Sequence, residues 1–213
     1  SDTAANLAAA FSGITTHTGN LTISETSTAT IAELVTINAA TSGTVTLSTE
    51  TIAANYSDTA ANLAAAFSGI TTHTGNLTIS ETSTATIAEL VTINAATAGT
   101  VTLSTETIAA NYSDTAVNLA AAFSGITTHT GTIAITGTNP TITQLNNISG
   151  ATSGVVTATI SGTATNLATL TTASTDAITI TISEGLRAAK AGRAPSTPAQ
   201  SRTKTGNSQT IAA

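Results

Sequence analysis

Three histidines in this sequence have side chains that could bind a metal. His17, His73 and His129 recur every 56 residues, each within Thr-His-Thr-Gly. Zinc binds imidazole nitrogen with bonds near 2 Å, so ligands that share one ion must converge on it. Stacked parallel strands lie about 4.8 Å apart, and a histidine on every second strand would recur only about every 10 Å. The spacing predicts solvated loop histidines and neither a metal site nor a catalytic histidine.

The carboxylates and hydroxyl groups lack the grouping that other chemistry needs. Glu25, Glu50, Asp2 and their copies do not form clusters of three in one short loop, whereas calcium binds six to eight oxygens. Asp58 and Glu89 are assigned to helix capping. No Gly-x-Ser-x-Gly or Ser/His/Asp arrangement occurs, and the glycines follow predicted helices, where they cannot hold a phosphate. We expect no catalytic residue, no metal and no cofactor.

One surface remains as a candidate binding site, the outward face of the predicted strands. Hydroxyl residues occupy strand positions that alternate with the apolar ones: Thr44, Thr46, Ser48, Thr78, Ser80, Thr100, Thr102 and Ser104. In a stacked sheet these residues would form flat, uncharged rows suited to a polysaccharide, to neighbouring copies or to ice. Threonine also favours solvent-facing strands through β propensity alone, so the rows do not by themselves indicate a ligand.

The residues that carry these groups belong to copies of one sequence. Residues 1–56 and 57–112 are identical except that Ser42 becomes Ala98. A third copy starts at Ser113, differs at Val117, and diverges after Gly131 while its pattern continues. Such periodicity indicates a repeat array. We expect the array over 1–183, with copies starting at 1, 57 and 113 and divergent units to 183. Because the chain opens within a repeat, we also expect a true N-terminus further upstream.

Each copy contains two strand–helix halves. Leu77 and Ile79 alternate with polar neighbours, as in a strand with one buried face. Thr86 and Glu89 form a capping-box pattern at the start of the next helix, and Gly99 is expected to end that helix.

The second half adds a strand, a connection and another helix. The connection over 107–112 has room for a short extra strand, and Ser113 or Asp114 is expected to cap the helix after it. In the divergent end, Asn139-Pro140 is expected to open a helix. We predict parallel strands, each preceded by a helix, at about 21–24, 44–48, 77–80, 100–104, 132–136, 155–161 and 177–183.

Strand–helix alternation predicts parallel strands joined by right-handed crossovers. A doubly wound sheet would need continuously apolar strands, and these strands alternate instead. A closed barrel would need a fixed number of units, which near-identical copies do not suggest. We therefore predict an α/β fold, an open solenoid of stacked strand–helix repeats with a parallel sheet and the helices on one face.

Composition narrows the possible partners. Charged residues make up 8% of the chain and apolar residues 40%, so the chain can build a core. All 11 acidic residues lie at or before Glu184 and all 5 basic residues lie after it. An acidic array repels phosphate backbones, so we expect no nucleic-acid binding. No apolar run approaches the roughly 20 residues of a membrane span. The basic stretch 184–213 is expected to be a disordered tail.

The sequence TGNLTISETSTATIAELVTINAATSGTVTLS resembles the Thr/Ala-rich strand–helix repeats of very large secreted surface proteins of cyanobacteria and other aquatic bacteria. The resemblance covers residues 1–183 and transfers no functional residue. It implies a structural or adhesive segment of a large extracellular bacterial surface protein. The implied location is the cell surface or the exterior, and the implied partners are cell-surface polysaccharide or neighbouring copies of the chain itself. The alternative is a binding module whose outward Thr/Ser strand face recognises polysaccharide or ice.

Overall fold

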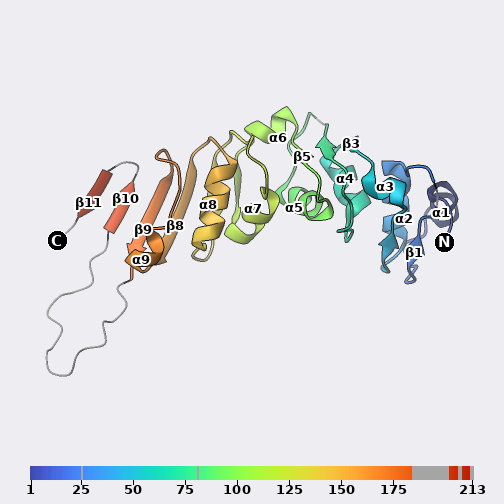
Figure 1. Cartoon of the computed structure of the whole chain (residues 1–213), viewed down its shortest axis with the longest axis horizontal. Coiled ribbons are helices and arrows are strands. Elements are labelled where there is room, and N and C mark those ends of the chain that lie inside the picture. Colours follow the sequence, from blue (N-terminus) through green and yellow to red (C-terminus); the bar gives the residue numbers. More distant parts are fainter. Residues whose placement is uncertain (25, 81, 184–201, 206–207, 212–213) are drawn as a thin grey trace, which may run out of the picture. The chain divides into compact units, whose positions relative to one another are not determined.

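The protein is a mixed α/β chain in which helices and strands alternate (Figure 1). A computed structural model describes residues 1–24, 26–80, 82–183, 202–205 and 208–211. The helices are α1 Ala4–Phe11, α2 Ile31–Ala40, α3 Thr49–Ala53, α4 Ala60–Phe67, α5 Ile87–Ala96, α6 Thr105–Ala109, α7 Ala116–Ala122, α8 Ile142–Ala151 and α9 Ala164–Leu167. The strands are β1 Leu21–Thr22, β2 Val45–Thr46, β3 Tyr56–Asp58, β4 Leu77–Ile79, β5 Val101–Thr102, β6 Tyr112–Thr115, β7 Ile133–Thr136, β8 Val156–Gly162, β9 Ala177–Ile182, β10 Arg202–Thr205 and β11 Ser208–Ile211.

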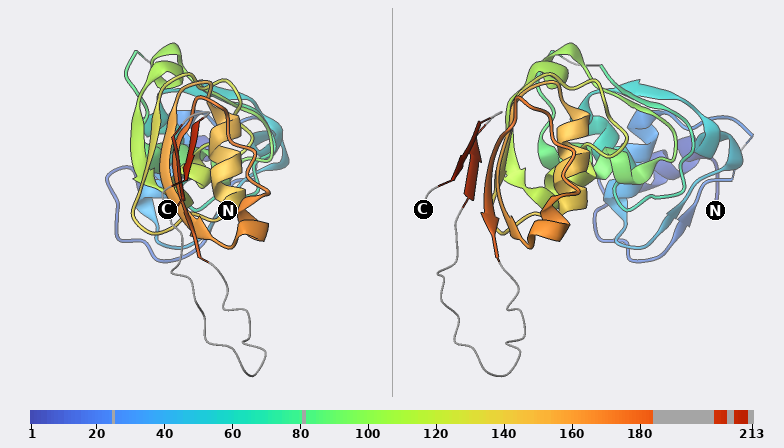
Figure 2. Two further views of the ribbon diagram at one scale, coloured as in Figure 1. Left: turned by 90° about the vertical axis from the view of Figure 1, so that its left-hand side faces the viewer. Right: turned by 60° about the vertical axis from the view of Figure 1, so that its left-hand side comes forward.

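The strands β1 to β9 form three parallel sheets. β1 pairs with β2, β4 lies between β3 and β5, and the third sheet has the order β6-β7-β8-β9. The strands β8 and β9 lie side by side along their length in Figure 2, in agreement with their six-residue register. The alternation of helices with parallel strands, predicted from the sequence, is confirmed.

The connection over 107–112 differs from the prediction. Residues 105–109 form the short helix α6, and the strand β6 then begins at Tyr112, so Ser113 and Asp114 lie in a strand and do not cap a helix. The hydroxyl of Ser104 accepts a hydrogen bond from the backbone N–H of Thr107 at 3.2 Å, which stabilises the first turn of α6. This local capping signal ends the preceding strand two residues earlier than expected.

Threonine side chains open the longer helices. The predicted capping box of Thr86 and Glu89 is confirmed at the start of α5. Thr141 and Gln144 form the same box in α8, so the cap of α8 is Thr141 and the prediction of Asn139-Pro140 was wrong.

Asp58 supports a helix start without being the cap. The N-cap of α4 is Thr59, whose side chain accepts from the backbone N–H of Asn62. The Asp58 carboxylate accepts from the backbone N–H of Thr59 at 2.7 Å and from the side chain of Asn62 at 2.8 Å. The carboxylate is therefore occupied by local structure.

Two glycines allow neighbouring chain segments to pack backbone against backbone. The helix α5 ends at Ala96, with Thr97 extended, so the expectation that Gly99 ends it through a left-handed turn was wrong. A Cβ atom on Gly99 would instead overlap the carbonyl oxygen of Gly75, and one on Gly75 would overlap that of Ala54. Only a residue without a side chain fits at these crossings.

Asparagine side chains link successive strands. The Oδ1 atom of Asn55 accepts from the backbone N–H of Asn76 at 2.8 Å, and Oδ1 of Asn76 accepts from that of Thr100 at 3.0 Å. Asn111 repeats the bond in the third sheet, to the N–H of Thr132 at 2.9 Å. Each side chain supplies an acceptor where a strand begins, so the backbone N–H there is satisfied.

The chain divides into two compact units, residues 1–109 with 121–126, and residues 110–120 with 127–213. In the first unit the cores of successive copies join. Ile14 is 41% exposed, whereas its counterpart Ile70 is 6% exposed, although the two stand in identical sequence. Helix α2 of the first copy packs against α4, and Tyr56 lies against Phe67 with ring centroids 5.6 Å apart. The first copy therefore covers apolar surface of the second.

In the second unit, a carboxylate is buried just before the strand β9. Asp176 is 4% exposed and accepts hydrogen bonds from Ser149 Oγ at 2.6 Å and from the backbone N–H groups of Val156 and Ala173 at 2.9 Å each. These donors satisfy the carboxylate and fix the chain before β9.

Part of the expected disordered tail, 184–213, is paired in the structure. The backbones of β10 and β11 form an antiparallel pair in which Arg202 is opposite Ile211. Threonine and isoleucine favour strands, which accounts for the departure from the prediction in these two segments. Residues 184–201, 206–207 and 212–213 lie outside the described residues. In the described part of the chain, no helix has the length and apolar character to cross a membrane.

Candidate binding face and pockets

The outward strand positions form short hydroxyl rows in the first unit. Thr78 pairs with Ser57 on one side and with Thr102 on the other, so one row crosses three strands. Thr22 and Thr46 form a second row on β1 and β2. Ser57, Thr46 and Thr102 are exposed, and Thr22 and Thr78 are half-buried. The rows are compact, uncharged patches.

Six of the eight residues predicted for this face have access to solvent: Thr44, Thr46, Thr78, Ser80, Thr100 and Thr102. The other two do not belong to it. Ser48 and Ser104 are each 7% exposed, because they turn inward to cap α3 and α6. The strict alternation assumed from the sequence stops where each short helix begins.

Sequence reasoning missed other members of the hydroxyl rows. Ser57 was overlooked because its segment was expected to open a helix. In the second unit, Thr159 pairs with Thr179 and Ser161 pairs with Thr181, all four exposed. The alternation of β8 and β9 carried the signal for these residues.

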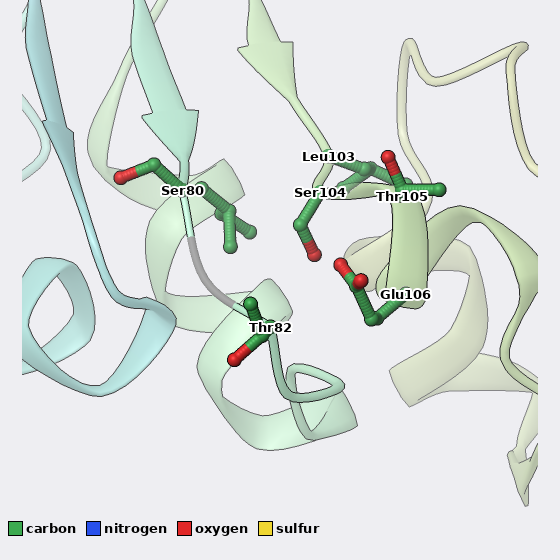
Figure 3. Close-up of a pocket in the computed structure, with 7 residues that line it drawn as sticks. Ser80, Thr82, Leu103, Ser104, Thr105 and Glu106 are labelled. Atoms are coloured by element: carbon green, nitrogen blue, oxygen red, sulfur yellow. The ribbon is translucent and has the colours of Figure 1, made fainter.

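A pocket of about 380 Å³ opens beside the hydroxyl rows, beyond the ends of β4 and β5. One wall contains Ile79, Ser80 and Thr82, and the other runs from Leu103 to Glu106. In Figure 3 the Glu106 carboxylate is directed from the α6 side towards the wall that carries Thr82. The described lining thus combines the Glu106 carboxylate with hydroxyl groups and the side chains of Ile79 and Leu103.

The same pocket occurs one repeat earlier. It has a volume of about 420 Å³, and each lining residue is the counterpart, 56 positions earlier, of one in the later pocket, with Glu50 in place of Glu106. Glu50 and Glu106 are half-buried, whereas the threonines at the mouths, Thr26 and Thr82, are exposed. The array therefore carries two pockets of one chemical design.

Hydrogen bonds below the pocket hold its two walls together. Thr107 is fully buried, and its Oγ1 atom accepts from Ser104 Oγ at 2.9 Å and from the backbone N–H of Ala85 at 3.0 Å. Thr51 makes the corresponding bonds in the earlier copy, at the same distances. The loop that carries Thr82 is therefore fixed to the helix that carries Glu106.

The predicted solvated histidines are buried in two copies, so that prediction was wrong. His73 is 0% exposed and His129 is 1% exposed. The ring of His73 lies 4.8 Å from that of Phe67 and 5.6 Å from that of Tyr56, between centroids. Tyr112 lies 5.6 Å from His129 in the same way. A tyrosine from the preceding copy packs against each histidine ring and helps to bury it. The sequence of the histidine loop alone does not indicate this contact between copies.

Burial sets the protonation of these rings. Burial lowers the pKa of His73 below the ordinary 6.5, and a smaller effect of the Thr51 backbone opposes this shift. Burial likewise lowers the pKa of His129, although its Nε2 atom lies 3.0 Å from the carbonyl oxygen of Ala110, which favours the protonated ring. Both rings are neutral at pH 7, which suits packing against aromatic rings.

The acidic side chains that the structure describes mostly serve local structure. Among the described residues, no group of three or more histidine, aspartate or glutamate side chains is placed to bind an ion. Glu33 and Glu89 serve capping boxes, and Asp2 accepts from Thr3 N–H and from the Asn6 side chain. Glu25 and its copy Glu81 lie outside the described residues.

No family model matches this chain, and neither a curated protein nor a solved structure matches it.

Proposed function

We propose that this chain is a structural or adhesive repeat segment of a large extracellular bacterial surface protein. In this proposal the repeats stack as an open solenoid with the helices on one face, and the array has no catalytic activity. The described parallel sheets and the alternation of strands with helices are compatible with that architecture.

The observation that carries the proposal is a contact that repeats itself between copies. The Nδ2 atom of Asn38 donates to the carbonyl oxygens of Ala65 at 3.0 Å and Ser68 at 2.9 Å, at the end of α4 in the next copy. Asn94 stands 56 residues later and donates to Ala121 at 3.0 Å and Ser124 at 2.8 Å. Because donor and acceptor are both encoded in every copy, the same joint can be added many times.

The surface of the described array suits contact with other large molecules at the cell exterior. Its outward strand positions are uncharged hydroxyl rows, and the chain has no cysteine that would respond to an oxidising environment. The resemblance to Thr/Ala-rich repeats of secreted surface proteins points the same way. We propose cell-surface polysaccharide or neighbouring copies as partners.

The second candidate is a binding module that recognises polysaccharide or ice through the hydroxyl rows. The row Ser57–Thr78–Thr102 favours this alternative, since it aligns hydroxyl residues across three strands. The strands of this sheet are only two or three residues long, however, which limits any regular grid. We propose that this segment alone does not bind ice, and thermal hysteresis measured on the purified chain tests that statement.

The structural role is tested by pulling the chain from its two ends in a single-molecule force experiment. A stack of repeats should open in successive steps, each releasing about 56 residues, or roughly 200 Å of contour at about 3.5 Å per residue. Replacing both Asn38 and Asn94 by alanine should lower the force of these steps. A single event that releases the whole array at once would contradict the stacked-repeat role.

A further inference from the structure

We propose that the two equivalent pockets of the first unit are binding sites for a neutral, hydroxyl-rich polysaccharide. This inference rests on the proposed adhesive role and gives that role a place and a ligand class. It moves the recognition from the hydroxyl rows themselves to the hollows beyond the ends of β1 and β2 and of β4 and β5.

The chemistry of the lining matches sugar hydroxyl groups. The carboxylates of Glu50 and Glu106 accept hydrogen bonds only, and two adjacent hydroxyl groups of a sugar ring can donate to one carboxylate. Thr82 and Thr105 are exposed at the mouth of the later pocket and can both donate and accept. Ile79 and Leu103, which are almost fully buried, add a small apolar area that the C–H face of a sugar ring can contact.

The two glutamates are not used by the helix caps that engage the other glutamates of the repeat. Glu33 and Glu89 close capping boxes on their own helices. The hydroxyl groups of the capping serines donate hydrogen bonds to the threonines that follow the two glutamates, Thr51 in α3 and Thr107 in α6. The caps are therefore complete without the carboxylates. Among the described lining residues, this division leaves one carboxylate in each pocket for a ligand.

Other ligand classes fit the pockets less well. An anionic ligand would be repelled by the Glu50 or Glu106 carboxylate, and the array over 1–183 contains no basic residue that could offset this repulsion. A calcium ion needs six to eight oxygens, and the described lining of each pocket supplies a single carboxylate with a few hydroxyl groups. A neutral polyol satisfies the acceptor and the hydroxyl groups without adding charge.

Hydrogen bonds hold the walls of both pockets, and the two pockets recur one repeat apart. Thr51 and Thr107 tie the opposite walls of each pocket together, which reduces the entropy lost when a ligand binds. A polymer that repeats one sugar can occupy both sites, so weak individual sites can hold it through multivalency. In the divergent end, β8 continues as a strand through 156–162, where the earlier copies turn into the short helix, so this design belongs to the near-identical copies.

The test is affinity electrophoresis of the full chain in native gels that contain a neutral polysaccharide: dextran, laminarin or a galactan. Alginate provides a charged comparison, and each gel is run with calcium and with EDTA. We expect at least one neutral polymer to retard the chain independently of calcium. Glu50→Gln or Glu106→Gln alone should weaken the apparent affinity about tenfold, and the double variant about a hundredfold.

The matched control is the double variant Glu33→Gln with Glu89→Gln. It makes the same chemical change in the same two copies, and the box of Thr141 with Gln144 shows that glutamine supports a capping box in this chain. We expect the control to bind within about twofold of the unaltered chain. Circular dichroism and thermal unfolding should be the same for the Glu50/Glu106 double variant and the unaltered chain, because these side chains are not needed for folding.

The outcomes separate this inference from the proposed function. If a neutral polymer retards the chain and the Glu50/Glu106 double variant equally, the pockets are not the site, and the adhesive role stands on another surface. Binding that requires calcium would also overturn the inference. If no neutral polymer retards the chain, the inference fails, while the proposed function is judged separately by the force experiment.

Discussion

The side-chain amide of Asn38 donates a 2.9 Å hydrogen bond to the backbone carbonyl of Ser68, 30 residues further along and in the next copy of the repeat. Ser68 follows the last residue of α4, where helix carbonyl groups lack partners within the helix. One asparagine thus completes the end of a neighbouring helix. The bond joins the local structure of one copy to the packing of the next.

Replacing Asn38 or Asn94 by alanine should destabilise the array. Asn38→Ala removes the side-chain donor to carbonyl groups at the end of α4. Asn94→Ala removes the donor to the carbonyl groups of Ala121 and Ser124. We expect each substitution to lower the free energy of unfolding by about 1–2 kcal/mol, measured by urea denaturation. Asn147→Ala, at an exposed position on α8, is the control and should change stability by less than about 0.5 kcal/mol. Equal effects at all three positions would contradict a specific role at the joint.

Two glycine substitutions should have opposite effects. In Gly75→Ala the new methyl group overlaps the backbone of Ala54, so we expect a loss of about 3 kcal/mol or failure to fold. In Gly150→Ala, within α8, no atom lies within 4 Å of the new methyl group, and the helix should gain about 0.5–1 kcal/mol. Thermal unfolding of the two variants gives the comparison. A tolerated Gly75→Ala would show that the copies do not pack as closely as described.

Stability should fall as the solution is acidified through the ordinary pKa of histidine. Burial lowers the folded-state pKa values of His73 and His129, so below about pH 6.5 the unfolded chain takes up protons that the folded chain resists. The stability that the two neutral histidines contribute is fully present above about pH 6.5. It is lost as the pH falls towards their lowered folded-state pKa values. Urea midpoints at pH 7.5 and 5.5 measure the effect, and replacing both histidines by phenylalanine should reduce the difference. An undiminished difference in that variant would assign the pH dependence to other groups.

The repeat boundaries and many elements could be predicted because their causes are local. The capping box of Thr86 and Glu89 requires only four consecutive residues, and the alternation of Leu77 and Ile79 requires only one strand. The helix over 105–109 was missed because its cap, Ser104, also fitted the alternation of the strand before it. Two local signals competed there, and the helix cap prevailed.

The surroundings of the candidate sites depended on contacts between copies and could not be predicted in the same way. His73 is buried because Tyr56 of the preceding copy covers it, and the sequence around the histidine itself suggests an exposed loop. The pocket walls come from two segments more than twenty residues apart, joined through Thr107 and Ala85. The hydroxyl positions were visible in the sequence, but their separation into exposed rows and buried caps was not.

The most direct test of stacking uses the three phenylalanines, Phe11, Phe67 and Phe123, which occupy the same position in successive copies. Phe67 is 0% and Phe123 is 3% exposed, whereas Phe11 is half-buried. Fluorine NMR of the chain labelled with fluorophenylalanine should give three signals, which the variants Phe11→Tyr and Phe67→Tyr assign. If copies stack as described, a dissolved paramagnetic agent will broaden the Phe11 signal and leave the other two sharp. Equal broadening of all three signals would show that the copies do not cover one another and would contradict the account.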